Sequence, residues 1–213
     1  MKVTIKTIAA LSGFAGLLIG NSVFAQNLLQ NPGFETGDLT DWNAQGTGVG
    51  ATIVVQAPNG PSAPGSFSAF MDDTLQANNL ALQQSTAPGD ASPGVVDYSF
   101  DILGNTSLVG GVAFVHIWDI SSTGAVIGQG PGLLGPYFPS TTGWTTISGS
   151  FTAPAGVDHF EIEFDCTTGA ATGSAESFSI DNVSLSQVPE PTSLALTAMG
   201  LVWVWKYRRS RSA

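Results

Sequence analysis

Residues 157–165 read VDHFEIEFD, and this stretch decides the fold class. Its large apolar residues, Phe160, Ile162 and Phe164, alternate with charged or polar ones. A period of two is typical of a β-strand that buries one face in a core and exposes the other to water. Around this stretch, clusters of Gly, Ser, Thr, Asn and Pro return about every 8–12 residues, with no convincing helical period between them. The pattern predicts an all-β domain.

The same pattern predicts a sandwich of about nine strands. We expect them at residues 27–31, 51–56, 66–72, 79–85, 94–103, 110–120, 144–152, 157–165 and 176–185. In the last strand, Phe178 and Ile180 have one parity and Val183 and Leu185 have the other. A β-bulge at residues 181–182 would bring all four side chains to one face.

Two further segments carry structural expectations. The run 112–118 is apolar on both faces, which predicts a central strand covered on each side and makes His116 a core histidine. Residues 128–143 form the longest stretch without strand signals. Long loops are often functional. Cys166 has no partner for an internal disulfide, and its place at the end of an apolar strand predicts a small buried residue.

The first 25 residues are typical of a secretory signal peptide. Two lysines, at positions 2 and 6, precede an apolar stretch over 8–19, and a small-residue cleavage site ends at Ala25. An N-terminal membrane anchor is the alternative, but this stretch is too short to span a bilayer. We therefore expect signal peptidase to cut here, leaving Gln26 as the mature N-terminus.

The last 26 residues form three zones, which are a VPEP string, an apolar segment over 192–205 and a basic end over 206–211. This order closely resembles the PEP-CTERM sorting signal. The residues that carry the likeness are Val188, Pro189, Glu190, Pro191, Arg208, Arg209 and Arg211. The resemblance implies a short transmembrane helix that holds the chain in the inner membrane only transiently, and an exosortase-type membrane protease that cuts near the VPEP string. It also implies the envelope, surface or extracellular matrix of a Gram-negative bacterium. The alternative is a permanent single-pass anchor.

Charge is divided sharply along the chain. All six Lys and Arg residues lie in the two terminal segments, whereas 15 of the 16 acidic residues lie between Glu35 and Asp181. So acidic a body is not expected to bind nucleic acid. Clustered carboxylates without basic partners must be solvated, protonated or neutralised by cations, and calcium is the natural candidate outside the cell. Acidity that merely keeps the protein soluble is the alternative.

Residues 26–187 contain the segments NPGFE at 31–35, DW at 41–42, FTAP at 151–154 and IDNVSL at 180–185. Together these segments resemble carbohydrate-binding-module jelly rolls of the galactose-binding-like type. The resemblance implies a jelly-roll β-sandwich with a structural Ca²⁺ between the first and last strands. Carried over by position, the side-chain ligands are Glu35 and Asp181, with Asp38 as a third candidate. Alternatively, Glu35 and Asp181 only accept hydrogen bonds from turn amides.

Three functions remain open from the sequence. The first is a noncatalytic, exported protein that binds extracellular polysaccharide through exposed aromatic rings, for which Tyr137, Phe138 and Trp118 are the candidates, while Trp42 and Trp144 are expected in the core. The second is a structural surface protein without a small ligand.

The third function is a glycosidase that uses two acids of strand 157–165, namely two of Glu161, Glu163 and Asp165. Residues two apart on a strand stand ~6.6 Å apart, which lies within the range that inverting glycosidases use. An alternating acidic strand gives this distance in any case, so a solvated face is the simpler interpretation. We identify no catalytic motif.

Overall fold

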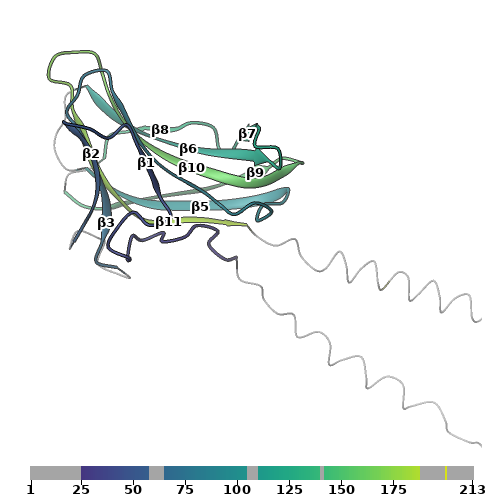
Figure 1. The fold of residues 1–213 in the computed structure, drawn as a ribbon. Helices are drawn as coiled ribbons and strands as arrows, with labels where there is room; N and C mark the ends of the chain where they lie inside the picture. The colour runs from purple at the N-terminus through teal and green to yellow at the C-terminus, as the bar shows by residue number, and fades with distance from the viewer. Residues whose placement is uncertain (1–24, 58–64, 105–109, 140–141, 188–199, 201–213) are drawn as a thin grey trace, which may run out of the picture.

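The computed structural model describes residues 25–57, 65–104, 110–139, 142–187 and 200. Two antiparallel sheets face each other (Figure 1). The six-stranded sheet has the order β1-β4-β10-β6-β7, with β8 also paired to β6, and the five-stranded sheet has the order β2-β3-β11-β5-β9. The strands are β1 (Asn43–Gln45), β2 (Ala51–Gln56), β3 (Ser68–Asp73), β4 (Asn79–Ser85), β5 (Gly94–Gly104), β6 (Gly111–Ser121), β7 (Val126–Gln129), β8 (Leu134–Tyr137), β9 (Thr145–Ala153), β10 (Val157–Thr168) and β11 (Glu176–Gln187). This arrangement confirms the predicted all-β, jelly-roll-like sandwich.

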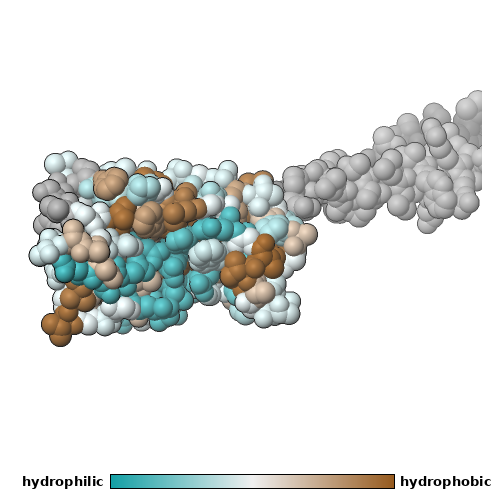
Figure 2. Space-filling model, turned by 90° about the horizontal axis from the view of Figure 1, so that it is seen from above, coloured by the Kyte–Doolittle hydropathy of each residue, from teal (hydrophilic) through white to brown (hydrophobic). Residues whose placement is uncertain are grey.

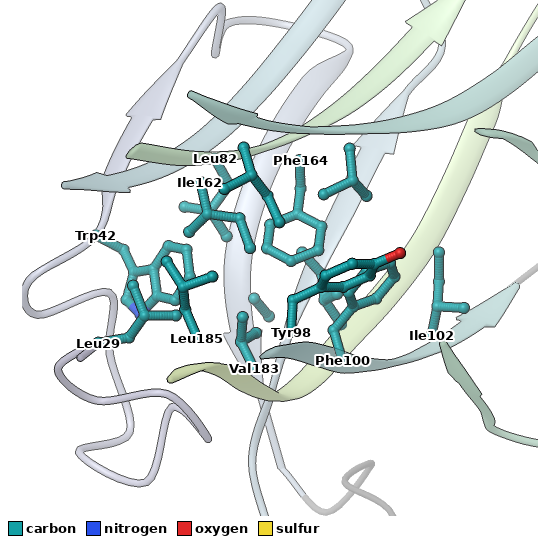
Figure 3. Close-up of a cluster of buried hydrophobic side chains, with 14 of the residues drawn as sticks. Leu29, Trp42, Leu82, Tyr98, Phe100, Ile102, Ile162, Phe164, Val183 and Leu185 are labelled. Carbon is teal, nitrogen blue, oxygen red and sulfur yellow. The ribbon is translucent and has the colours of Figure 1, made fainter. Parts of the chain in front are cut away.

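The core lies between the sheets and follows the predicted alternation. Phe160, Ile162 and Phe164 of β10 are fully buried. The Phe164 ring lies 5.2 Å from the ring of Phe100 and 6.2 Å from that of Trp42, so it joins strands of both sheets to the segment before β1 (Figure 3). Aromatic contacts of this kind add to the stabilisation from apolar burial. Trp42 therefore lies in the core as expected, whereas Trp144 is only partly buried.

The bulge predicted in the last strand is present. The register between β11 and β5 shifts between Asp181 and Ser184, and Asn182 has a φ of 49°. The extra residue of the bulge brings the apolar side chains before and after it to the same face of the sheet. All four of these side chains are buried against the core, namely Phe178, Ile180, Val183 and Leu185. Cys166 is also fully buried, and burial raises the pKa of its thiol.

The expected strand at 27–31 is not a strand. Its only sheet pairing is a single bridge between Asn27 and Ser186, although the backbone N–H of Leu28 donates to the carbonyl of Leu185 at 2.8 Å. The side-chain amide of Asn27 replaces the ladder, because it donates to the carbonyl of Val183 and accepts from the N–H of Leu185. A side-chain amide that makes the hydrogen bonds of a strand backbone produces no alternating pattern in the sequence.

Two expectations about the middle of the chain are also corrected. The stretch 128–143 is not a structureless loop, because it contains β8 and the end of β7. Strand β6 is paired on both edges, but no further layer formed by the described residues covers its outer face. Phe114, His116 and Trp118 on that face are only partly buried. His116 is therefore not a core histidine. Aromatic side chains occur both in cores and on partly exposed sheet faces, so the sequence alone does not distinguish the two positions.

The predicted signal peptide and sorting tail lie outside the described residues, apart from Ala25 and Gly200, which are both exposed. Within the part of the chain that the structure describes, no helix is both long and apolar enough to cross a membrane.

Candidate functional site

The outer face of the six-stranded sheet gathers aromatic and hydrogen-bonding side chains from four adjacent strands. We call it the polar sheet face and define it by Asn79, Gln83, His116, Trp118, Gln129, Glu161, Glu163 and Asp165. Strand pairing sets their order, since His116 stands opposite Glu163 and Trp118 stands opposite Glu161. From the side of β6, β8 and β10, Figure 2 shows a hydrophilic band that crosses the molecule between apolar groups.

Trp118 is the aromatic residue of this face. Its indole lies flat against the imidazole of His116, with ring centroids 4.9 Å apart and an angle of 8° between the planes. The side-chain amide of Gln129 lies 2.8 Å from Nδ1 of the same imidazole. Both rings are partly exposed, so this edge of the face presents an oriented aromatic pair to solvent.

The acids of β10 are held by neighbours on β4 and β6. Asp165 accepts a hydrogen bond from Nδ2 of Asn79 at 2.7 Å, and its other oxygen lies 3.3 Å from Nε2 of His116. Glu161 accepts a hydrogen bond from the Ser85 hydroxyl at 3.0 Å. Burial raises the pKa of Glu163 to about 7, and the charges of Asp165 and Glu161 and a hydrogen bond with Asp165 add to this effect.

This geometry weakens the glycosidase interpretation. Glu163 and Asp165 each offer a carboxylate oxygen, and these oxygens lie within 4.8 Å of each other. Retaining enzymes hold their two carboxyl groups about 5–5.5 Å apart, and inverting enzymes about 6.5–9.5 Å. Glu163 and Asp165 are therefore closer together than the two acids of either class of enzyme.

The structure separates the other two aromatic candidates. Phe138 is 77% exposed, just beyond the end of β8. Tyr137 instead packs against the core, with its ring edge-on to Phe100 at 6.1 Å. Burial, followed by the charge of Tyr98, raises the pKa of its phenol. The two residues therefore do not present one common surface, and only Phe138 is displayed.

Glu35 and Asp181, the expected calcium ligands, lie on either side of Gly33. A Cβ atom placed on Gly33 would lie 3.4 Å from Oδ1 of Asp181 and 3.7 Å from Cγ of Glu35. The adjoining cavity has a volume of about 560 Å³, and its lining includes Glu35 and Asn182. Two residues far apart in the sequence thus meet where the N-terminal segment runs along β11.

Asp181 is the unusual residue of this junction. It is 1% exposed, and its Oδ1 accepts a hydrogen bond from the backbone N–H of Asn182 at 2.6 Å, but its Oδ2 is buried without a partner. Burial raises its pKa to about 7, and the charges of Glu35 and Asp101 act in the same direction against the opposing Asn182 hydrogen bond. A buried oxygen without a donor is costly unless a proton or a cation satisfies it.

The other two expected calcium ligands, Glu35 and Asp38, differ in their surroundings. Glu35 does accept hydrogen bonds from turn amides, since its Oε1 receives the N–H groups of Ser66 and Phe67. Asp38 is exposed and accepts hydrogen bonds within its own turn from Thr36 and Thr40, which lower its pKa. The structure therefore brings Glu35 and Asp181 together around Gly33, whereas the hydrogen bonds of Asp38 stay within its own turn. Of the three acids, only Glu35 lines the cavity.

The partners of the β10 acids were not evident from the sequence. His116, Asn79 and Gln129 join them only through strand pairing, and β10 lies between β4 and β6, which are far from it in sequence. The alternation of β10 shows that its acids share a face but says nothing about which strands lie beside them.

The sequence matches no protein-family model and no curated protein. Solved structures do match the fold. A domain described as enzymatically active, from tailspike protein 4 of bacteriophage CBA120, aligns with 75% of this chain at a TM-score of 0.58 and 17% identity, but the chain spans only 21% of that protein. The module TmCBM61, solved with beta-1,4-galactotriose, aligns at a TM-score of 0.51 and 19% identity over 75% of this chain and 97% of the module.

A xylan-binding CBM22-1 domain from Paenibacillus barcinonensis aligns at a TM-score of 0.53 and 15% identity, over 77% of this chain and 96% of that domain. At these identities the likeness is one of fold, and many functions share one sandwich. The chain therefore shares its β-sandwich fold with these carbohydrate-binding modules and with the tailspike domain.

Proposed function

We propose that the chain is a noncatalytic, exported protein that binds polysaccharide through its polar sheet face. The observation that carries this proposal is the position of Trp118, which stands in register between Glu161 on β10 and Gln129 on β7. An aromatic ring flanked by hydrogen-bonding side chains matches the two sides of a sugar, whose apolar ring face stacks and whose hydroxyls hydrogen-bond. The likeness of the fold to carbohydrate-binding modules supports the same conclusion.

In this proposal each group has its own role. His116 covers one face of the indole and fixes its orientation, so the opposite face of Trp118 receives the sugar ring. Glu161 and Gln129 then contact hydroxyl groups on either side of that ring. Because both rings are already held in place, little conformational entropy is lost when the sugar binds.

Retention of the full chain in native gels that contain soluble xylan, galactan or the producing organism's own extracellular polysaccharide tests the proposal. Trp118→Ala should weaken binding to the retained polysaccharide about tenfold or more, since central aromatic residues often contribute above ~1.4 kcal/mol. Trp144→Ala is the matched control, because Trp144 is also partly exposed but lies outside the polar sheet face. Equal retention of the wild type and Trp118→Ala would remove this face from the binding site.

A structural calcium ion at the junction of the N-terminal segment and β11 is part of the proposal. Glu35 and Asp181 supply carboxylate oxygens, as a hard cation requires, and the unpartnered Oδ2 of Asp181 gives the ion a buried ligand. Bound calcium would neutralise charge where the chain has no basic side chain, and would tie the first segment of the domain to its last strand.

Export and sorting complete the proposal, and they rest on the sequence of the termini. Signal peptidase would leave Gln26 at the start of the chain, and an exosortase-type protease would end it near Pro189. Intact-mass analysis of protein extracted from the cell surface tests both boundaries. A species that still carries residues 203–211 would show a permanent anchor, and an intact body that retains no glycan would leave the structural-protein alternative.

A further inference from the structure

We propose that His116, Glu163 and Asp165 form a binding site for a divalent transition metal of the zinc type on the polar sheet face. Each residue offers one ligand atom, and these atoms all lie within 4.8 Å of one another. The three residues come from β6 and β10, whose pairing places His116 opposite Glu163 and diagonal to Asp165. Zinc binding at this site does not depend on sugar binding.

The distances fit a shared ion better than a direct contact. Nε2 of His116 lies 3.3 Å from Oδ2 of Asp165. A charge-assisted hydrogen bond between such groups is ordinarily ~2.7–2.9 Å long. Two ligands that bind one zinc ion at ~2.0–2.1 Å in a tetrahedral arrangement stand about 3.3 Å apart. The observed separation therefore matches two ligands of one ion.

Each of these two ligands is also held by a second residue. Asn79 donates to Oδ1 of Asp165 at 2.7 Å, which leaves Oδ2 directed at the imidazole. The amide nitrogen of Gln129 lies 2.8 Å from Nδ1 of His116. When zinc binds Nε2, a half-turn of this amide brings its oxygen to the ring, where it accepts a hydrogen bond from the Nδ1–H group. Trp118 stacks on the same ring. Outer partners of this kind are a regular feature of metal-binding histidines.

The ligand chemistry identifies the class of metal. One imidazole nitrogen with carboxylate oxygens suits zinc and neighbouring transition metals, whereas calcium prefers oxygen ligands alone. The ligand oxygens of Glu163 and Asp165 lie within 4.8 Å of each other, and the body of the chain contains no Lys or Arg to neutralise them. The junction of Glu35 and Asp181 offers only oxygen, so the two sites should select different ions.

Calorimetric titration of the full chain, purified in mild detergent, with ZnCl₂ tests the site. We expect one zinc ion per chain at the polar sheet face, and a visible absorption spectrum with Co²⁺ that includes nitrogen ligation. His116→Gln and Asp165→Asn should each abolish this binding. Gln129→Ala keeps all three ligands and should weaken zinc binding about 10–100-fold.

Two matched variants serve as controls for the location of the zinc ion. His159→Gln removes the only other histidine of the chain, and Asp181→Asn alters the junction site, so neither should change zinc binding. The proposal is overturned if the wild type takes up no zinc, if a folded His116→Gln protein binds zinc as the wild type does, or if His159→Gln or Asp181→Asn abolishes the binding. Melting curves of every variant establish that it is folded.

Discussion

The junction around Asp181 and the polar sheet face accommodate carboxylates in different ways. Both gather carboxylates in a body without basic side chains. At the junction the backbone is irregular, with a β-bulge and a positive φ at Asn182, and one oxygen of Asp181 is left without a partner. On the sheet face the ladder between β10 and β6 is regular from His159 to Thr168, and side chains of adjacent strands contact the acids.

The difference shows that the local backbone determines which hydrogen-bonding partners a buried carboxylate can reach. A regular ladder places side chains of neighbouring strands side by side, so that Asp165 finds Asn79 and His116 within reach. A bulge turns a side chain away from those neighbours. Asp181 therefore depends on a proton or on a cation from solution, and its behaviour should respond to calcium where that of the sheet face does not.

The largest expected effect is the loss of calcium from the junction. An ion that binds only the folded state stabilises it by about 2.7 kcal/mol at a hundredfold excess over its Kd. Chelation should therefore lower the melting temperature of the wild type by about 5–10 °C. Differential scanning calorimetry of zinc-free protein measures the change, and added calcium should restore the original value.

Asp181→Asn keeps the shape of the side chain and removes its charge, so it should abolish this calcium dependence. Glu163→Gln, on the polar sheet face, is the matched control and should retain it. If a chelator leaves the wild-type melt unchanged and elemental analysis finds no calcium in the purified protein, the junction site does not exist, and Glu35 and Asp181 are ordinary turn residues.

Glu176 offers a smaller test, because it is a buried acid on the regular part of the strand that contains Asp181. It is 4% exposed, it faces Asp73 of β3 across the ladder, and burial raises its pKa to about 7. The folded chain therefore binds the proton of the Glu176 carboxyl group more tightly than the unfolded chain does. Stability from this group is therefore complete below about pH 4.5 and is lost as the pH rises to about 7.

Glu176→Gln should remove that pH dependence. At pH 8 the variant should be more stable than the wild type by roughly 1–2 kcal/mol, and at about pH 4 the two should agree. Urea denaturation at both values measures the difference. A gain of the same size at the lower pH would mean that packing rather than ionisation is responsible, and a gain that disappears in calcium would place Glu176 with Asp181.

Much of this comparison could be predicted from local sequence. The alternation of residues 157–165 predicts both the core face of β10 and its acidic face, because a period of two follows from strand geometry alone. The parity change around Asp181 predicts the bulge, since apolar side chains on both sides of it must reach the same core. These are features that a single strand carries in itself.

The rest depends on contacts between distant parts of the chain. The pairing of β10 with β4 and β6 brings Asn79 and His116 to Asp165, and no pattern within β10 specifies its neighbours. The role of Asn27, whose amide replaces a strand ladder, is equally invisible to periodicity. Short edge strands such as β7 and β8 are also missed, because four residues show too little alternation.

The smallest expected effect separates Phe138 from Tyr137 at the margin of the polar sheet face. Phe138→Ala should change the free energy of unfolding by less than about 0.5 kcal/mol, because the ring is 77% exposed. Tyr137→Ala should lower it by about 1–2 kcal/mol, because its ring packs against Phe100.

Since β8 pairs with β6, a long polysaccharide bound at Trp118 has Phe138 within its reach, and Phe138→Ala should then weaken retention only a few-fold. Unchanged retention together with an unchanged melt would confine binding to Trp118 and its neighbours, whereas a loss as large as that of Trp118→Ala would move the centre of the site to the end of β8.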